Sequence, residues 1–505
     1  IGGNFQNDGA FAEQTSTVTF NGTGTQQING TSKTIFNNLA ISSGTTTAVA
    51  DVDLKGLMTV GNSAIMNLGV GNFTLKSSSL TQDAAIGDLS GGGQVNGTLN
   101  VERFMQDLNI APMDDVNGYQ YRYLAAPVTG ANIGQLSQSG IPIAGDFSDA
   151  DISTTAYGSV FQYDATNEYY IYYPANGGTM ASNPLNNGTG YVVYSYDMPS
   201  DLAITLTGTV VTGGVSVPII AGPIEGYNLV GNPYPSAIDW DNVTMPAGLV
   251  NAVYLTDNVN LSNTPEGAYT TYVPGVGATN PPTGVPGWSG EIALGQSFWV
   301  EATSNTTLNF KEADKTTNQS IFFRQAEPAD FIKVRLTRDG KGDETIIHFE
   351  SEATEGFDER FDAKKFKNNA YNISTYDAAQ DLDLVINSLP FADCDAGVDL
   401  RVADVALGQY ALEFEGLDSF TFGVQITLQD VFLDQSVAIT SGTIYAFEVT
   451  SDAGSHGDGR FKVTFSKEIG NINPTYQTVD DCEAYQVLIE DAERGTMYTI
   501  WQGDN

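Results

Sequence analysis

Short runs of β-branched and aromatic residues, separated by glycine turns, recur along almost the whole chain and constrain its fold more than any other feature. Stretches such as STVTFNGTGTQQING alternate apolar and polar residues and end at Asn-Gly, Gly-Thr or Ser-Gly pairs. Only residues 356–368 offer a helical candidate of any length, and it is a weak one. The sequence therefore predicts an all-β fold: a β-solenoid-like N-terminal region followed by tandem β-sandwich modules of jelly-roll or immunoglobulin-like type.

Residues 1–105 are the predicted solenoid-like region. Their strand patterns repeat loosely in units of about twenty residues, as expected where each unit covers the apolar face of its neighbour. A plain β-sandwich is the alternative for this region. The side chains expected to point inward are Phe5, Phe11, Phe20, Ile28, Phe36, Leu39, Ile41, Leu54, Leu57, Ile65, Leu68, Phe73 and Leu75.

A tyrosine-rich region, 106–315, contains a duplicated pattern. YRYLAAPV and YNLVGNPY each place a tyrosine six residues before a proline, Pro127 in the first and Pro233 in the second. An aromatic residue follows at nearly equal distance, Tyr191 64 residues after the first proline and Phe298 65 after the second. A catalytic motif has no need to occur twice with its spacing preserved. We interpret the pattern as a duplicated β-sandwich unit in which each proline ends a strand.

The rest of the chain divides into three parts. Residues 316–329 are polar and mixed in charge, as a linker would be. Residues 330–470 contain seven or more alternating runs with Asp-Gly and Ser-Gly turns, which predict a β-sandwich. Residues 471–505 are interpreted as the start of a further immunoglobulin-like sandwich.

Charge and cysteine content exclude several classes of protein. The net charge of −39, from 60 acidic and 21 basic residues, argues against nucleic-acid binding and against docking on anionic lipid. No apolar run approaches the ~20 residues of a membrane-spanning helix, so membrane insertion is not expected. Cys394 and Cys482 could pair or remain two separate buried thiols.

The sequence offers little for catalysis, so we expect that the chain is not an enzyme. His348 lies in TIIHFE, where a strand position explains it, and His456 lies in a loop without a triad pattern. No nucleophile elbow, phosphate loop or metal-ligand His/Cys spacing is present.

Calcium is the one cofactor that the sequence suggests. Clustered loop carboxylates supply the oxygen ligands that Ca²⁺ prefers, although neither of two clusters has the EF-hand spacing and both could be solvated acidic loops. These candidate metal ligands are Asp146, Asp149 and Asp151 in GDFSDADIS, and Asp393, Asp395 and Asp399 in FADCDAGVDLRVAD.

Aromatic side chains suggest a second kind of site. Trp240, Trp288 and any exposed tyrosines could stack on sugar rings, although packing in the core or between strands is the preferred interpretation for most of them.

Several stretches together resemble a known group of proteins. NFQNDGAF and TVTFNGTGTQQINGTSKTIFNNLAIS resemble the strand repeats of very large surface proteins of the Bacteroidetes that the type IX secretion system exports. GYNLVGNPYPSAIDW, GQSFWVEA and DETIIHFESEATEGFDERFDAKKF resemble the modules near the C-termini of such proteins, which include gliding-motility adhesins. The resemblance covers nearly the whole chain and supplies no catalytic residues.

The resemblance implies an extracellular protein at the cell surface, anchored to the outer membrane. We expect a non-catalytic structural and adhesive segment that forms a rigid β stalk presenting or anchoring adhesion. Its expected partners are cell-surface or type IX secretion components, other copies of itself, or surface glycans. The alternative is a secreted glycan-binding or polysaccharide-degrading β protein.

Overall fold

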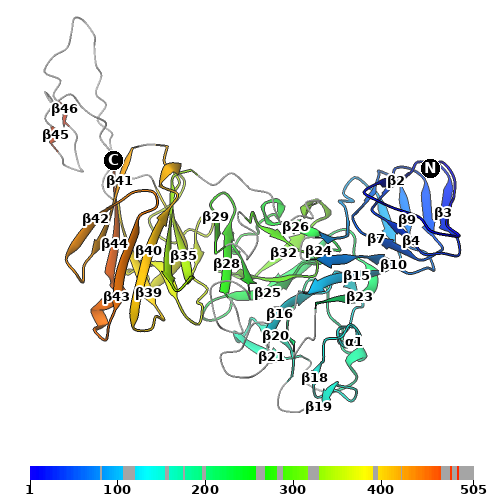
Figure 1. The fold of residues 1–505 in the computed structure, drawn as a ribbon, viewed down its shortest axis with the longest axis horizontal. Coiled ribbons are helices and arrows are strands. Elements are labelled where there is room, and N and C mark those ends of the chain that lie inside the picture. The colour runs from blue at the N-terminus through cyan, green and yellow to red at the C-terminus, as the bar shows by residue number, and fades with distance from the viewer. Residues whose placement is uncertain are drawn as a thin grey trace, which may run out of the picture. The chain divides into compact units, whose positions relative to one another are not determined.

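The computed structural model contains two compact units, which are described separately below: residues 1–327 with 359–368, and residues 328–358 with 369–505. Strands make up most of the regular structure, so the predicted all-β fold is confirmed (Figure 1). The residues that the structure describes are 1–79, 82–105, 120–153, 158–173, 177–195, 201–257, 268–280, 288–316, 329–390, 396–421, 423–467, 478–479 and 486–487.

The N-terminal part of the first unit is a β-solenoid of parallel sheets. Along one sheet Thr25 pairs with Thr45, and Thr45 pairs with Ile65, so each of these coils advances by the repeat that the sequence predicts. Stacked coils bury one continuous core between them. The solenoid strands are β1 (Phe5–Gln6), β2 (Thr17–Phe20), β3 (Thr25–Asn29), β4 (Thr34–Phe36), β5 (Asn38–Ile41), β6 (Thr45–Ala48), β7 (Val52–Leu54), β8 (Leu57–Val60), β9 (Ile65–Asn67), β10 (Phe73–Leu75), β11 (Ser77–Ser79), β12 (Gln82–Asp83), β13 (Ala85–Ile86), β14 (Gln94–Asn96) and β15 (Thr98–Met105).

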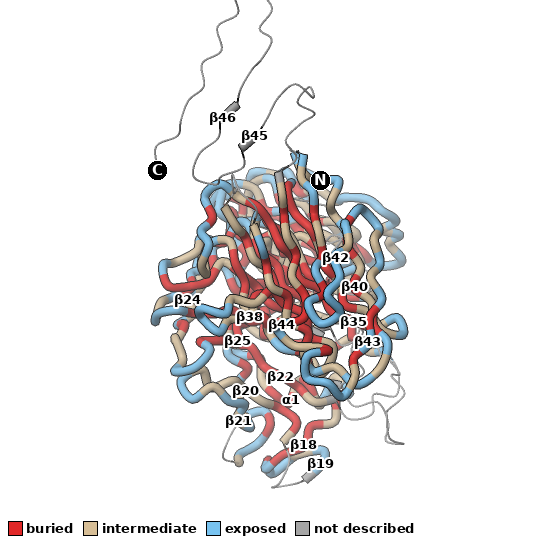
Figure 2. Tube along the Cα trace, turned by 90° about the vertical axis from the view of Figure 1, so that its left-hand side faces the viewer, coloured by how far each residue is buried: buried red, intermediate tan, exposed pale blue. Residues whose placement is uncertain are grey.

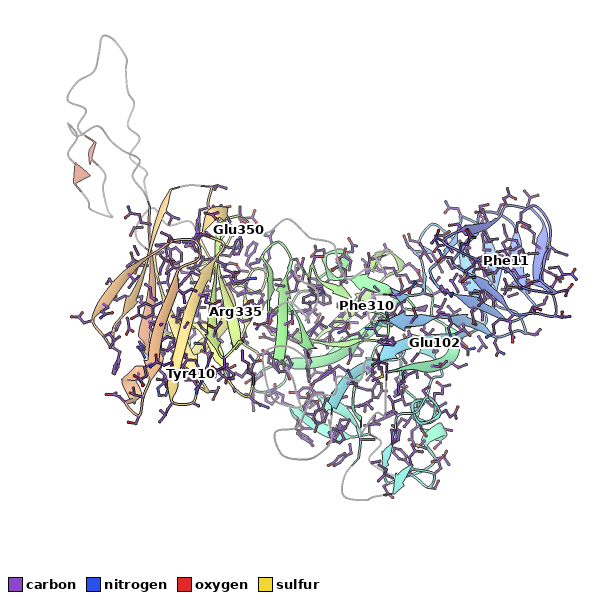
Figure 3. The ribbon with its side chains drawn as sticks, in the orientation of Figure 1. Phe11, Glu102, Phe310, Arg335, Glu350 and Tyr410 are labelled. Atoms are coloured by element: carbon purple, nitrogen blue, oxygen red, sulfur yellow. The ribbon has the colours of Figure 1, made fainter. Side chains whose placement is uncertain are left out.

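Most of the predicted inward side chains do form the solenoid core, and two do not. Leu57 and Ile65 are only half-buried, whereas the adjacent Met58 and Met66 are 0% exposed. Because side chains alternate between the two faces of a strand, the prediction is one residue out of register there. Phe11, labelled in Figure 3, is half-buried and packs against the core with the other predicted ring near the N-terminus.

The solenoid continues into the duplicated region without a break in hydrogen bonding. β15 pairs in parallel with β10, and on its other edge it pairs antiparallel with β23 (Leu202–Val210). The register with β23 runs from Thr98 opposite Thr209 to Met105 opposite Leu202. One sheet, in the order β17-β23-β15-β10-β7-β4, therefore crosses the predicted boundary at residue 105.

The duplicated region folds into several small sheets around the solenoid's last strands. Its helix α1 (Ile133–Gln138) lies against β23, since Gln135 exchanges side-chain hydrogen bonds with the backbone of Thr207. The remaining elements of the first unit are β16 (Gln120–Ala125), β17 (Val128–Thr129), β18 (Ala144–Gly145), β19 (Ile152–Ser153), β20 (Val160–Asp164), β21 (Tyr169–Tyr172), η1 (Met180–Ser182), β22 (Gly190–Ser195), β24 (Val215–Ile219), β25 (Tyr227–Gly231), β26 (Ala237–Asp239), η2 (Trp240–Asn242), β27 (Val253–Asp257), β28 (Ala268–Val273), β29 (Gly277–Thr279), β30 (Glu291–Ile292), β31 (Ser297–Glu301), β32 (Thr306–Phe310), η3 (Glu312–Asp314), β33 (Lys315–Thr316) and β36 (Ala363–Lys364).

The duplication that the sequence predicts is present in the sheets. The order β16-β22-β20-β21 matches the order β25-β31-β27-β28, and neighbouring strands are antiparallel in both. We call these sets of strands the first copy and the second copy. Pro127 and Pro233 each follow the first strand of their copy by two residues, so each proline stands where that strand has ended, as predicted.

The two copies contact each other through corresponding residues. The N–H of Ala125 donates to the carbonyl of Gly295 at 2.9 Å, and the N–H of Gly231 donates to the carbonyl of Gly188 at 3.0 Å. Ala125 and Gly231 each precede their proline by two residues, and Gly188 and Gly295 each precede the later aromatic residue by three. These exchanged bonds make the contact isologous, as between the subunits of a two-fold dimer.

The second unit is formed by one curled sheet in the order β42-β41-β44-β39-β37-β38-β35-β34-β40-β43, rather than by the two packed sheets of the predicted β-sandwich. Tyr410, labelled in Figure 3, is in its apolar core, where its ring stacks 5.8 Å from that of Phe447. Its elements are β34 (Phe331–Arg338), β35 (Lys341–Phe349), β37 (Asn372–Asp377), β38 (Leu382–Leu389), β39 (Ala396–Ala403), β40 (Gly408–Glu415), η4 (Leu417–Ser419), β41 (Val424–Asp430), β42 (Gln435–Ile439), β43 (Ile444–Val449), η5 (Ala453–Ser455), β44 (Gly457–Lys467), β45 (Thr478–Val479) and β46 (Gln486–Val487).

The weak helical prediction at 356–368 is wrong. These residues form turns, extended chain and the short strand β36, and residues 359–368 belong to the first unit while the chain on either side belongs to the second. Most of the predicted linker 316–329, and most of the predicted module 471–505, lie outside the described residues. No helix among those described has the length and apolar character needed to cross a membrane.

Candidate functional site

The first predicted calcium loop uses two of its carboxylates to fix nearby chain. Asp149 accepts a hydrogen bond from the backbone N–H of Met180 at 2.7 Å, and Asp151 accepts one from the Ser137 hydroxyl at 3.0 Å. Asp146 is exposed. Within the described part of the chain, no group of three or more His, Cys, Asp or Glu side chains is placed to hold a metal ion. Calcium binding at this loop stays a prediction.

The second predicted calcium loop is described only at its end. Asp393 and Asp395 lie outside the described residues, as do Cys394 and Cys482. Asp399 is on β39, where its register partner is Lys462 of β44. Calcium binding at this loop therefore stays a prediction, and so do the two alternatives for the cysteines.

Both tryptophans considered for sugar stacking are core residues, so the preferred interpretation of core packing is confirmed for them and sugar stacking is wrong. Trp240 is 1% exposed and Trp288 is 3% exposed, and both belong to the apolar core beside the second copy. His348 lies on β35, where its Nδ1 is 3.2 Å from the Ser388 hydroxyl and burial lowers its pKa. The strand position predicted for this histidine is confirmed.

An aromatic face is the most distinctive surface of the duplicated region. On the first copy, the ring of Phe161 lies 5.1 Å from Tyr172 and 6.3 Å from Tyr121. The face continues onto the second copy, where Trp299 lies 4.8 Å from the ring of Tyr163. β25 is buried along its length whereas β21 is largely exposed (Figure 2). Tyr172 on β21 retains 45% exposure.

Residues 359–368, which we call the arm, cover the second copy's part of this face. The ring of Phe366 lies between 4.0 and 5.8 Å from four other rings, so it fills a nearly closed aromatic cluster. The arm is also fixed by its ends: the carbonyl of Glu359 accepts from the N–H of Asn251, and the Asn368 amide oxygen accepts from the N–H of Tyr269. The four rings around Phe366 are those of Tyr227, Tyr254, Tyr269 and Trp299.

An ion pair with a buried carboxylate lies beside this aromatic cluster. The carboxylate of Glu301, which is 0% exposed, pairs with the ammonium of Lys364 from the arm. Burial raises the pKa of Glu301, and the charge of Lys364 opposes that rise. Tyr227 and Tyr254 are also buried, with burial raising the pKa of both hydroxyls. The arrangement suits recognition of a segment that presents a cation and, two residues later, an aromatic ring.

A buried ion pair joins the solenoid to the duplicated region. One oxygen of Glu312 accepts from the N–H of Leu89 in the solenoid at 3.1 Å, and the other accepts from the N–H of Gly213 at 2.8 Å. Lys315 lies 2.7 Å from the same carboxylate and 4.9 Å from the ring centre of Tyr234. Burial lowers the pKa of Lys315, and Glu312 opposes that shift. The carboxylate therefore bridges three segments of chain.

Sequence reasoning did not identify Glu301, Glu312 or the arm as a site. An acidic residue that ends an otherwise apolar strand, as Glu301 does in GQSFWVE, was the available signal for a buried charge. For Glu312 and Lys315 the pairing follows only from the fold, because a polar tract such as FKEADKTT is normally solvated.

Comparison with known proteins gives a family without a function. A family model described as a domain of unknown function, DUF8693, matches residues 4–465. The chain belongs to this family. The DUF8693 match runs through both compact units. No curated protein and no solved structure matches the chain significantly.

Proposed function

We propose that this DUF8693 chain is a non-catalytic segment of a large extracellular surface protein, in which its β modules form a rigid stalk that presents or anchors adhesion. One observation carries the proposal: the sheet that runs from β4 in the solenoid through β15 to β23 in the duplicated region. A joint made of ladder hydrogen bonds resists bending far more than a flexible linker does.

The buried pair at the same joint supports the proposal. Glu312 binds backbone of both regions, and the N–H of Ile86 in the solenoid donates to the carbonyl of Pro235 at 3.0 Å. Export by the type IX system and anchoring at the outer membrane are proposed from the resemblance of the sequence alone. The expected partners remain surface components, further copies of the chain, or surface glycans.

Spin-label distances test the rigidity of the joint. Thr59 on β8 and Ser216 on β24 are exposed, so both positions accept a labelled cysteine in a chain whose own two cysteines are replaced by serine. We expect a distance distribution as narrow as that of a Thr25–Thr59 control pair within the solenoid. A broad distribution for Thr59–Ser216 beside a narrow control would contradict a rigid stalk.

One observation favours the alternative of a glycan-binding protein, namely the exposed tyrosines of β21. A glycan array and a polysaccharide hydrolysis assay on the intact chain test that alternative. A stalk should give no signal in either assay. Hydrolysis of any polysaccharide would overturn the proposal that the segment is non-catalytic.

A further inference from the structure

The strand registers relate each residue of the first copy's aromatic face to one on the second. Tyr121 pairs with Tyr194 on the first copy, and Tyr227 pairs with Glu301 on the second. Tyr121 therefore corresponds to Tyr227, and Tyr194 corresponds to Glu301. Val192 takes the place of Trp299 by the same register.

The correspondence extends to the next two strands. Phe161 pairs with Val192 as Tyr254 pairs with Trp299, which places Phe161 at the position of Tyr254. Tyr170 likewise takes the position of Tyr269.

Three of the four rings that surround Phe366 on the second copy thus have an aromatic counterpart on the first. The counterparts of Tyr227, Tyr254 and Tyr269 are Tyr121, Phe161 and Tyr170.

Corresponding rings are more exposed on the first copy than on the second. Tyr227 and Tyr254 are 4% and 0% exposed beneath the arm. Their counterparts on the first copy, Tyr121 and Phe161, are half-buried. Tyr170 is 44% exposed, whereas its counterpart Tyr269 is half-buried. Burying ring surface of this kind against a partner is energetically favourable, and exposed aromatic patches mark interaction sites.

We propose that the aromatic face of the first copy is a docking site for an extended polypeptide segment of another chain, the counterpart of the site that the arm occupies on the second copy. The segment presents an aromatic side chain at the position of Phe366. It needs no cation at the position of Lys364, because Tyr194 stands where Glu301 stands. The inference concerns what this surface binds and does not depend on the stalk proposal.

A peptide-binding experiment on the intact chain tests this site. The probe is a synthetic peptide with the sequence of residues 357–370, and the matched control peptide carries Phe366→Ala. Since the chain's own arm occupies the second copy, we expect one equivalent of the probe to bind in isothermal titration and the control peptide not to bind. Hot-spot aromatic residues dominate such contacts, so Tyr172→Ser and Phe161→Leu should each weaken binding by about tenfold or more.

The protein control is Tyr169→Ser. Tyr169 is adjacent to Tyr170 on β21 and 53% exposed, and it points to the opposite face of the strand. Its substitution should leave the affinity unchanged. Because Tyr172 is 45% exposed, its replacement should cost little stability, and an unchanged thermal melt will separate lost binding from lost folding.

Three results would overturn the proposal. The first is no binding of the probe at millimolar concentration. The second is binding that Tyr172→Ser and Phe161→Leu leave intact, because the peptide would then be replacing the arm on the second copy. The third is an oligosaccharide that binds in a Tyr172-dependent way and excludes the peptide, because the occupant would then be a sugar.

Discussion

The carboxylate of Glu312 accepts a hydrogen bond from the backbone N–H of Leu89, which precedes it by 223 residues in the chain. Removing the carboxylate leaves the buried ammonium of Lys315 without its counter-ion. We expect Glu312→Ala to lower the free energy of unfolding by about 3–5 kcal/mol, as the loss of one partner of a buried pair does. Urea unfolding followed by circular dichroism measures the change.

The control for Glu312→Ala is Glu13→Ala. Glu13 pairs with Lys55 on the surface of the solenoid, where Lys55 is 44% exposed. A solvent-exposed ion pair contributes little to stability, so this variant should unfold almost like the wild type. Equal losses in the two variants would show that the joint is not held by its buried charge.

Lys364→Met should make stability depend on pH through Glu301. Burial raises the pKa of Glu301. At a pH between the unfolded-state and folded-state pKa values, the folded protein therefore holds a proton on this carboxyl that the unfolded chain has released. Such a group stabilises the fold most at low pH, and this stability is lost as pH rises through the folded-state pKa. Without the Lys364 charge that pKa rises further. We therefore expect the variant to lose more stability than the wild type as the pH rises above the ordinary pKa of a glutamate side chain.

The double variant Glu301→Gln with Lys364→Met supplies the control for that pH dependence. It has no titrating carboxyl at this position, so the extra slope of the single variant should disappear. Unfolding in urea at several pH values measures both variants. A single variant whose slope matches the double variant would contradict a buried, titrating Glu301.

Met58→Ala should destabilise the protein by about 2–5 kcal/mol, because it leaves a cavity in the solenoid core. Leu57→Ala, one residue earlier on β8, should cost clearly less, since Leu57 is only half-buried. Thermal unfolding of the two variants measures the difference. Equal losses would place both side chains in the core and contradict the register of this strand.

Calcium should raise the melting temperature if the predicted acidic loops bind it, because a ligand of the folded state stabilises that state. The measurement compares scanning calorimetry in calcium and in excess chelator, with an Asp149→Asn and Asp151→Asn chain as the control. A melting temperature that chelation does not change would remove the calcium prediction.

Periodicity predicted the parts of the fold in which local pattern and tertiary environment agree. The twenty-residue step of the solenoid and the duplication marked by Pro127 and Pro233 both follow from repeated spacing, which sequence displays directly. The errors at Leu57 and Ile65 arose because each has an apolar neighbour, a methionine, so alternation alone did not decide which residue faces inward.

The arm and the joint could not be predicted in this way. DERFDAKKFKN has charges and aromatic residues at spacings that suit a short amphipathic helix, and nothing local shows that Phe366 packs among rings made by strands about a hundred residues earlier. Likewise, the distant partners of Glu312 are the backbone N–H groups of Leu89 and Gly213, which any residue but proline can supply. Sequence pattern does not encode such contacts.

The arm also sets the order in which the protein can be completed. Lys364 and Phe366 follow the strands of the second copy in the chain, so a polypeptide emerging N-terminus first displays Glu301 and its surrounding rings before their cover has been made. During that interval the half-finished chain is a natural client for a holdase chaperone. A product truncated between Glu301 and Lys364 would stay in that state permanently, and aggregation or proteolysis would be its expected fate.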